Sequence, residues 1–141
     1  MLIDKSEIRE VHGISHLEKQ RIMDFLHGAV YCWCNNNNNN KDAWFSARDF
    51  LGGDNFLWQG SPLYALFEKQ KKLGKNSENS VKDAGKDSGW LLKKVIHADK
   101  RKFETKKEDL IRKYRWTEKR ILINKFCKRR KIPVPNTLLL F

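Results

Sequence analysis

The residues whose types and spacing could do chemistry are a carboxylate and a lysine two positions apart, Glu104 and Lys106. Three more carboxylates precede them, Asp83, Asp87 and Asp99. In magnesium-dependent nucleases, carboxylates hold the metal while a lysine stabilises the charge at the scissile phosphate. The triplet Glu104-Thr105-Lys106 is short enough to arise by chance. The strands that carry such a motif in nucleases are not evident in this sequence. We therefore expect a non-enzymatic protein. A metal-dependent nuclease is the third hypothesis, and it requires Asp87 or Asp99 to converge on the triplet.

Other catalytic or metal-binding patterns are weak. The chain has no phosphate-cradling glycine motif and no Gly-x-Ser-x-Gly motif. His12 and His16 are spaced at four, but the glycine between them and a helix cap at Ser15 argue against one continuous helix. Cys32 and Cys34 are two residues apart, so on a helix their side chains point in different directions. No second pair of cysteines follows that could complete a metal site. We expect no metal and no cofactor.

The net charge of the chain lies in its last third. Residues 1–90 carry 12 Lys/Arg and 12 Asp/Glu, whereas residues 91–141 carry 17 Lys/Arg and 5 Asp/Glu. The whole net charge of +12 therefore belongs to residues 91–141. Like charges at this density repel one another, and a polyanion relieves that cost when its counterions are released. The asymmetry predicts an anionic partner, most often nucleic acid.

A basic amphipathic segment over residues 118–131 sharpens this prediction. Arg120, Asn124 and Lys128 are spaced at four and form one ridge of a helix whose other side is apolar. Arginine matches guanine and asparagine matches adenine in the major groove, while lysine contacts phosphate. The plainer interpretation is a solvated helix. The predicted contacts are Lys93, Lys94, Arg101, Lys102, Arg112, Lys113, Arg115, Arg120, Asn124, Lys125, Lys128, Arg129 and Lys131.

Three aromatic residues lie among these cations. Trp90 falls on the basic side of a helix predicted over residues 81–98, and Tyr114 and Trp116 alternate with Arg112, Lys113 and Arg115. Exposed rings in such surroundings stack on unpaired bases. Large aromatics more often pack inside a protein, and the apolar tail at residues 138–141 is one surface that could cover Trp90. Both interpretations stay open.

Local signals define the elements that position these residues. Ser15 and Glu18 have the spacing of a capping box, Pro62 suits the first turn of a helix, and Ser80 is the expected cap of the helix that carries Trp90. Helices are predicted over residues 15–33, 46–51, 62–73, 81–98 and 118–131. The polar linker 74–80 divides a neutral helical scaffold, residues 1–74, from a strongly basic helical half, residues 75–141, within one compact domain.

Residues 101–116 fit two structures. A second capping box favours a helix through Tyr114, whereas the alternation of apolar residues also fits a two-stranded hairpin. The expected fold is mainly α, a compact helical domain of five to six helices. It becomes winged-helix-like if residues 101–116 form a hairpin, with helix 81–98 in the groove and the hairpin as the wing.

The leading hypothesis is a non-enzymatic nucleic-acid-binding protein of bacterial or mobile-element type, with DNA slightly favoured over RNA. The alternative is a protein-interaction or oligomer-forming module that uses exposed aromatics and the apolar tail, Leu138–Phe141, in a homodimer. The start of the chain turns charged at once, and its apolar runs are too short to span a bilayer. With its odd count of cysteines, this predicts a cytoplasmic location and no membrane partner.

Overall fold

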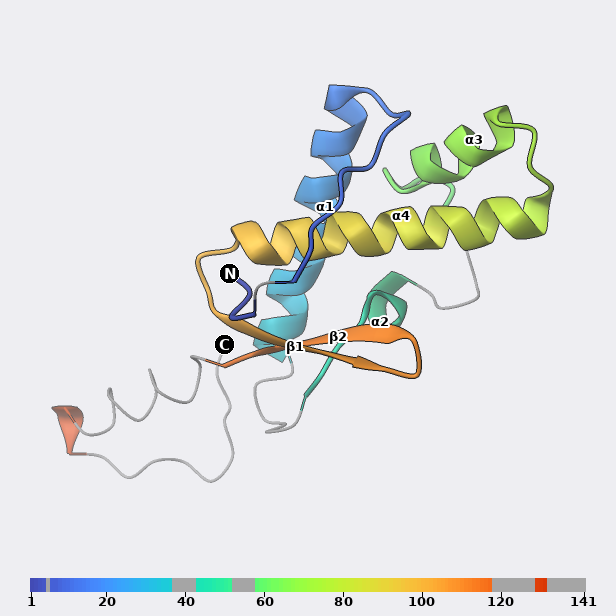
Figure 1. The fold of residues 1–141 in the computed structure, drawn as a ribbon. Coiled ribbons are helices and arrows are strands. Elements are labelled where there is room, and N and C mark those ends of the chain that lie inside the picture. The colour runs from blue at the N-terminus through green and yellow to red at the C-terminus, as the bar shows by residue number, and fades with distance from the viewer. Residues whose placement is uncertain (5, 37–42, 52–57, 118–128, 132–141) are drawn as a thin grey trace.

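The computed structural model describes residues 1–4, 6–36, 43–51, 58–117 and 129–131. Its elements are α1 (His16–Asn36), α2 (Ala47–Leu51), α3 (Tyr64–Lys72), α4 (Ser77–Ala98), β1 (Phe103–Glu108) and β2 (Ile111–Trp116) (Figure 1). The mainly α class is confirmed. The predicted count of five to six helices is not, because the described residues form four. Of the helix predicted over 118–131, the structure describes only residues 129–131.

The start of α1 follows the predicted capping box. The backbone N–H of Ser15 donates to Glu18 Oε2 at 3.0 Å, and the N–H of Glu18 donates to Ser15 Oγ at 3.1 Å. The backbone N–H of Ser46 likewise donates to Asp49 Oδ2 at 2.5 Å at the start of α2. Each pair satisfies backbone donors that the first turn of a helix leaves without a partner.

The predicted start of α4 is wrong by one turn. Asn76, not Ser80, is the cap, and its Oδ1 accepts from the N–H of Asn79 at 2.8 Å. Ser80 is buried, and its hydroxyl lies 3.4 Å from the carbonyl oxygen of Lys75. Asparagine caps a helix as well as serine does. The earlier start brings α4 against α3, and the division of the chain at residue 74 stays a prediction.

Residues 101–116 form a hairpin, so the favoured helix through Tyr114 is wrong. β1 and β2 pair antiparallel, with Phe103 opposite Trp116 and Glu108 opposite Ile111. Asp109 and Leu110 both have positive φ, at 50° and 65°, which is the backbone of a tight two-residue hairpin turn.

Segments distant in sequence close both edges of this hairpin. Phe103 accepts from the N–H of Ile3 at 3.1 Å, and Phe45 and Tyr114 exchange backbone hydrogen bonds at 2.9 and 2.8 Å. A backbone bridge on each side pairs polar groups that an extended hairpin would otherwise leave open. These distant partners outweigh the local capping signal, and they are the reason that the stretch is not helical.

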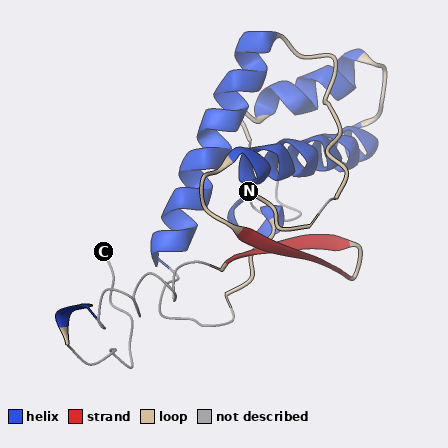
Figure 2. Cartoon of the chain, turned by 60° about the vertical axis from the view of Figure 1, so that its left-hand side comes forward, coloured by secondary structure: helices blue, strands red, loops and turns tan. Residues whose placement is uncertain are grey.

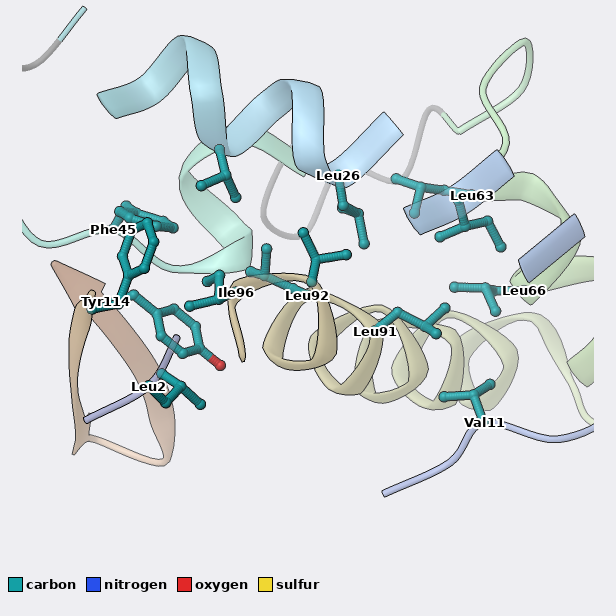
Figure 3. Packing of buried hydrophobic residues seen from close by; sticks show 14 of the residues in the cluster. Leu2, Val11, Leu26, Phe45, Leu63, Leu66, Leu91, Leu92, Ile96 and Tyr114 are labelled. Atoms are coloured by element: carbon teal, nitrogen blue, oxygen red, sulfur yellow. The ribbon is translucent and has the colours of Figure 1, made fainter. Parts of the chain in front are cut away.

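The core lies around α4, on which the other helices pack (Figures 1 and 2). α3 lies on one side of α4 and the hairpin on the other in both views. Leu26 of α1 and Leu63 approach α4 near Leu91 and Leu92, while Phe45 and Tyr114 fill the end near the hairpin (Figure 3). Trp58 is also buried, and it belongs to the same core cluster.

Candidate nucleic-acid interface

The hairpin has two faces of different character. Directly opposed residues of an antiparallel pair lie on the same face. The face toward the core, here the inner face, carries Phe103, Thr105, Lys107, Arg112, Tyr114 and Trp116. The outer face carries Glu104, Lys106, Glu108, Ile111, Lys113 and Arg115. The predicted contacts in the hairpin are therefore split between two surfaces.

The cations of the outer face are paired with acids and with a ring. Lys106 and Lys113 both reach Glu108, at 3.0 and 3.1 Å, and these two lysines lower the pKa of the Glu108 carboxyl. Arg115 binds Glu104 at 2.5 Å. The cationic groups of Lys106 and Arg115 also lie 4.5 and 4.6 Å from the ring centroid of Trp44. Glu104, Glu108 and the Trp44 ring therefore balance much of the positive charge on the outer face.

The inner face changes from apolar to cationic toward the turn. Lys107 and Arg112 lie directly opposite each other, with Lys107 exposed and Arg112 partly exposed. Arg112 Nη1 donates to Thr105 Oγ1 at 3.3 Å. Among the described residues, no carboxylate forms an ion pair with Lys107 or Arg112.

Lys93 does not lie on an open basic face, as the sequence suggested, but is only 5% exposed. The segment before α1 runs along this part of α4 (Figure 1), and Lys93 Nζ lies 5.3 Å from the ring centroid of Trp90. Burial lowers the pKa of the Lys93 ammonium, and the positive charge of Arg112 lowers it further, against the opposing charges of Asp4 and Glu7.

The three aromatic rings proposed for base stacking all pack against the core. Tyr114 is 2% exposed, and burial raises the pKa of its phenol, so this ring packs inside the fold. Trp90 and Trp116 are partly buried. The guanidinium of Arg9 lies 5.0 Å from the Trp90 ring, and that of Arg101 lies 5.4 Å from the Trp116 ring. Their placement supports the packing interpretation, and Arg9 of the N-terminal segment lies beside Trp90.

Arg101 is engaged inside the fold. Its Nε and Nη2 donate to the two carboxylate oxygens of Asp99 at 2.9 and 2.6 Å. The guanidinium also lies 5.9 and 5.5 Å from the rings of Tyr31 and Phe103. The Asp99 side chain is 4% exposed; burial alone would raise its pKa, but the hydrogen bonds from Arg101 bring it below the ordinary value. This arrangement joins the end of α4 to β1, so it gives Arg101 a structural role.

The remaining predicted contacts divide between described and undescribed parts of the chain. Lys94 forms an ion pair with Glu10. Lys102, Arg129 and Lys131 are exposed. The other predicted contacts, Arg120, Asn124, Lys125 and Lys128, lie outside the described residues, as do Cys127 and the apolar tail.

The convergence that a nuclease requires is not formed. Asp87 Oδ2 accepts from Lys69 at 2.7 Å and from Gln70 at 2.9 Å, while Asp99 binds Arg101. Within the part of the chain that the structure describes, no three His, Cys, Asp or Glu side chains gather closely enough to hold a metal ion. Cys32 is exposed and Cys34 is buried, so these two do not face the same way.

Sequence reasoning missed Trp44 and Arg9. Trp44 and Phe45 alternate outward and inward beside β2, with Phe45 1% exposed and Trp44 partly exposed against the outer face. That alternation is the period of a strand, and it is the signal that could have identified a further strand-like segment. Arg9 gave no comparable signal, because its partner Trp90 is far along the chain.

Comparisons of the chain with protein-family models, with curated proteins and with solved structures found no match. None of the helices in the described ranges combines the length and the apolar character needed to cross a membrane.

Proposed function

We propose that this protein binds nucleic acid through its basic third. One observation supports this most directly: among the ion pairs between described residues, the acids of residues 1–90 pair mostly with cations of the same range. Asp83 and Asp87 pair with Lys75 and Lys69, which also lie within residues 1–90. Of the acids in residues 1–90, Glu10 alone pairs with a residue beyond 90 among the ion pairs between described residues.

The excess positive charge therefore stays with the hairpin and the residues that follow it. Residues 91–117 carry 10 Lys/Arg and 4 Asp/Glu, and residues 118–141 carry 7 Lys/Arg and 1 Asp/Glu. Both segments are therefore net positive to the same extent. A phosphate backbone is the polyanion with the matching charge density, and we infer contacts from both segments.

In this proposal the hairpin serves as the wing that the sequence predicted only as an alternative for residues 101–116. α4 is a poor candidate for the helix that enters a groove, because α1, α2 and α3 all contact it. The ridge of Arg120, Asn124 and Lys128 remains the proposed recognition surface. The preference for DNA over RNA and the bacterial or mobile-element origin are expectations from the sequence.

The test is a titration of labelled duplex DNA, single-stranded DNA and RNA at several salt concentrations, with and without magnesium. If five phosphates of a duplex are neutralised, a plot of log K against log salt has a slope of about −4 to −5. A flat plot contradicts the proposal. Cleavage of the nucleic acid in the arm with magnesium would instead support the nuclease hypothesis.

A matched pair of variants locates the surface. The test variant replaces Arg120, Lys128, Arg129 and Lys131 with alanine. The control variant replaces Arg21, Lys71, Lys72 and Lys82, which are exposed cations of residues 1–90, where positive and negative charges balance. Both lose four positive charges, so a general charge effect weakens binding equally. We expect the test variant alone to lose most of its affinity and salt dependence, and equal losses would contradict a contact surface in residues 118–131.

The protein-interaction alternative has less support. It relied on exposed aromatics, but Trp90, Tyr114 and Trp116 pack within the chain. Its second requirement, the apolar tail Leu138–Phe141, lies outside the described residues. A homodimer through that tail remains a prediction, and sedimentation of the full chain beside a variant that lacks residues 138–141 would test it.

A further inference from the structure

The turn of the hairpin carries a leucine where the backbone favours glycine. Asp109 and Leu110 have φ of 50° and 65°, so both central residues of the turn lie in the left-handed region. Asparagine or aspartate followed by glycine is the usual pair in such a turn, because glycine has no Cβ to clash with the backbone. Asp109 fits this pattern and Leu110 does not. Backbone outliers with bulky side chains cluster at functional sites.

The Leu110 side chain has little to pack against. It is 87% exposed, more than any other large hydrophobic side chain in the part of the chain that the structure describes. In both views the turn between β1 and β2 lies at the outer edge of the described fold (Figures 1 and 2). One exposed leucine alone is ordinary on a protein surface. This one also has an unfavourable backbone conformation, and contacts within the fold do little to offset it.

Two cations lie on the strands just behind this tip. Lys107 of β1 is directly opposite Arg112 of β2, and no described carboxylate forms an ion pair with either. Like charges in this position are unfavourable in a sheet, and phosphate groups would balance them. With a rise of ~3.4 Å per residue, Leu110 lies roughly 7 Å beyond this pair. The minor groove of B-DNA is about 7.5 Å deep. A tip at the base edges would therefore leave both cations at the level of the phosphates.

We propose that the hairpin inserts Leu110 as an apolar wedge between two base pairs of duplex DNA, from the minor groove, while Lys107 and Arg112 contact the flanking phosphates. This inference deepens the proposed function and rests on it. Proteins that kink DNA from the minor groove insert phenylalanine, leucine, isoleucine or methionine in this way, beside basic residues. The wedge leaves water for the base stack, and the kink brings more of the backbone to the protein.

A lipid surface is the other partner that could take an exposed apolar tip beside cations. Binding to a membrane grows with the apolar area buried, and this tip offers one leucine next to the exposed carboxylate of Asp109. A single apolar side chain suits one base step better, because it is the size of wedge that unstacks such a step. The carboxylate of Asp109 opposes binding to either polyanion. Asp109→Asn keeps a residue that suits the turn and should therefore tighten duplex binding.

Two variants separate the wedge from the turn. Leu110→Gly removes both the wedge and the unfavourable backbone conformation, whereas Leu110→Ala removes the wedge and keeps a Cβ. The control is Leu17→Ala, which truncates a leucine of α1 that is 60% exposed. None of these changes alters a charge. Leu110→Gly should raise the unfolding temperature of the full chain by about 3 °C, and Leu110→Ala should leave it nearly unchanged.

Binding is measured by fluorescence anisotropy at several salt concentrations, and energy transfer between the two ends of the duplex reports bending. A second duplex has a central mismatch, where unstacking is easier. We expect Leu110→Gly and Leu110→Ala each to weaken binding to the paired duplex roughly tenfold, the loss of one buried leucine. The salt slope should not change, because no phosphate contact is lost. The wild type and Leu17→Ala should bend the duplex and prefer the mismatch, and both Leu110 variants should lose these properties.

The outcomes separate this inference from the proposed function. Weaker duplex binding by a more stable Leu110→Gly protein supports the wedge, because a purely structural leucine would not have this effect. If both Leu110 variants bind and bend the duplex as the wild type does, the wedge is overturned while nucleic-acid binding stands. If the wild type binds no nucleic acid, both proposals fail. Vesicles of phosphatidylcholine and phosphatidylserine test the lipid alternative: if Leu110→Gly weakens binding to them and not to the duplex, the tip meets lipid and the wedge is wrong.

Discussion

Replacing Arg101 with methionine should destabilise the fold because it removes the guanidinium that balances most of the charge of a buried carboxylate. The Asp99 side chain is 4% exposed and that of Arg101 17% exposed. Removing one member of a buried ion pair costs about 3–5 kcal/mol. Because part of Arg101 still reaches solvent, we expect the lower end of this range, about 3 kcal/mol.

The matched control is Arg115→Met in the same hairpin. Arg115 also binds a carboxylate and lies over a ring, but its side chain and that of Glu104 are 31% and 40% exposed. An exposed pair contributes at most about 1 kcal/mol. Each variant removes an ion pair and a contact with an aromatic ring, and the ion pair of Arg101 is the more buried of the two.

Urea unfolding monitored by circular dichroism gives the free energy of unfolding for both variants. A double variant, Asp99→Asn with Arg101→Met, should recover part of the loss, because it removes the uncompensated charge. The reasoning is refuted if Arg101→Met lowers the free energy of unfolding no more than Arg115→Met does. It is also refuted if Asp99→Asn destabilises the Arg101→Met variant as much as it destabilises the wild type, because the two changes would then act independently.

Three further predictions concern stability. Asn76→Ala should lower the free energy of unfolding, measured in urea, by about 1 kcal/mol, because the structure places the cap of α4 at Asn76. Ser80→Ala should lower it less, and a larger loss for Ser80→Ala would contradict a helix that begins after Asn76. The lowered pKa of Asp99 contributes stability that is present above its unfolded pKa of 3.8 and is lost as the pH falls through its folded pKa. Asp99→Asn should flatten this acid slope. The raised pKa of Tyr114 contributes stability below pH 10.0 that is lost at higher pH, so Tyr114→Phe should remove part of the alkaline loss, and an unchanged alkaline profile would contradict burial of the phenol.

Features that depend on neighbouring residues were predictable. The capping box at Ser15 needs only Glu18 three positions later, and the structure forms it. The buried face of α4 also follows from its period, with Ala84, Leu91 and Ile96 all in the core. Helix ends were less certain, because Asn76 and Ser80 are both good caps and packing selects between them.

Features that depend on distant partners were not predictable. The hairpin is stabilised along its edges by residues 1–3 and 45, which no local pattern of 101–116 contains. The same limit applies to the candidate site. A count of charges identified the basic third, but it could not show that Glu108 balances the outer rung, that Asp99 holds Arg101, or that Lys93 is buried.

The closure of the hairpin by Leu2 and Phe45 also has a consequence for the order of folding. During synthesis, both segments leave the ribosome well before β1 and β2 exist. Neither segment can pair until the hairpin strands have been synthesised. Contacts between residues 2 and 103 are among the slowest to form, because they close most of the chain into a loop. We expect the helices to assemble first and the hairpin to join last, so that the basic surface is completed only when the two ends of the described core meet.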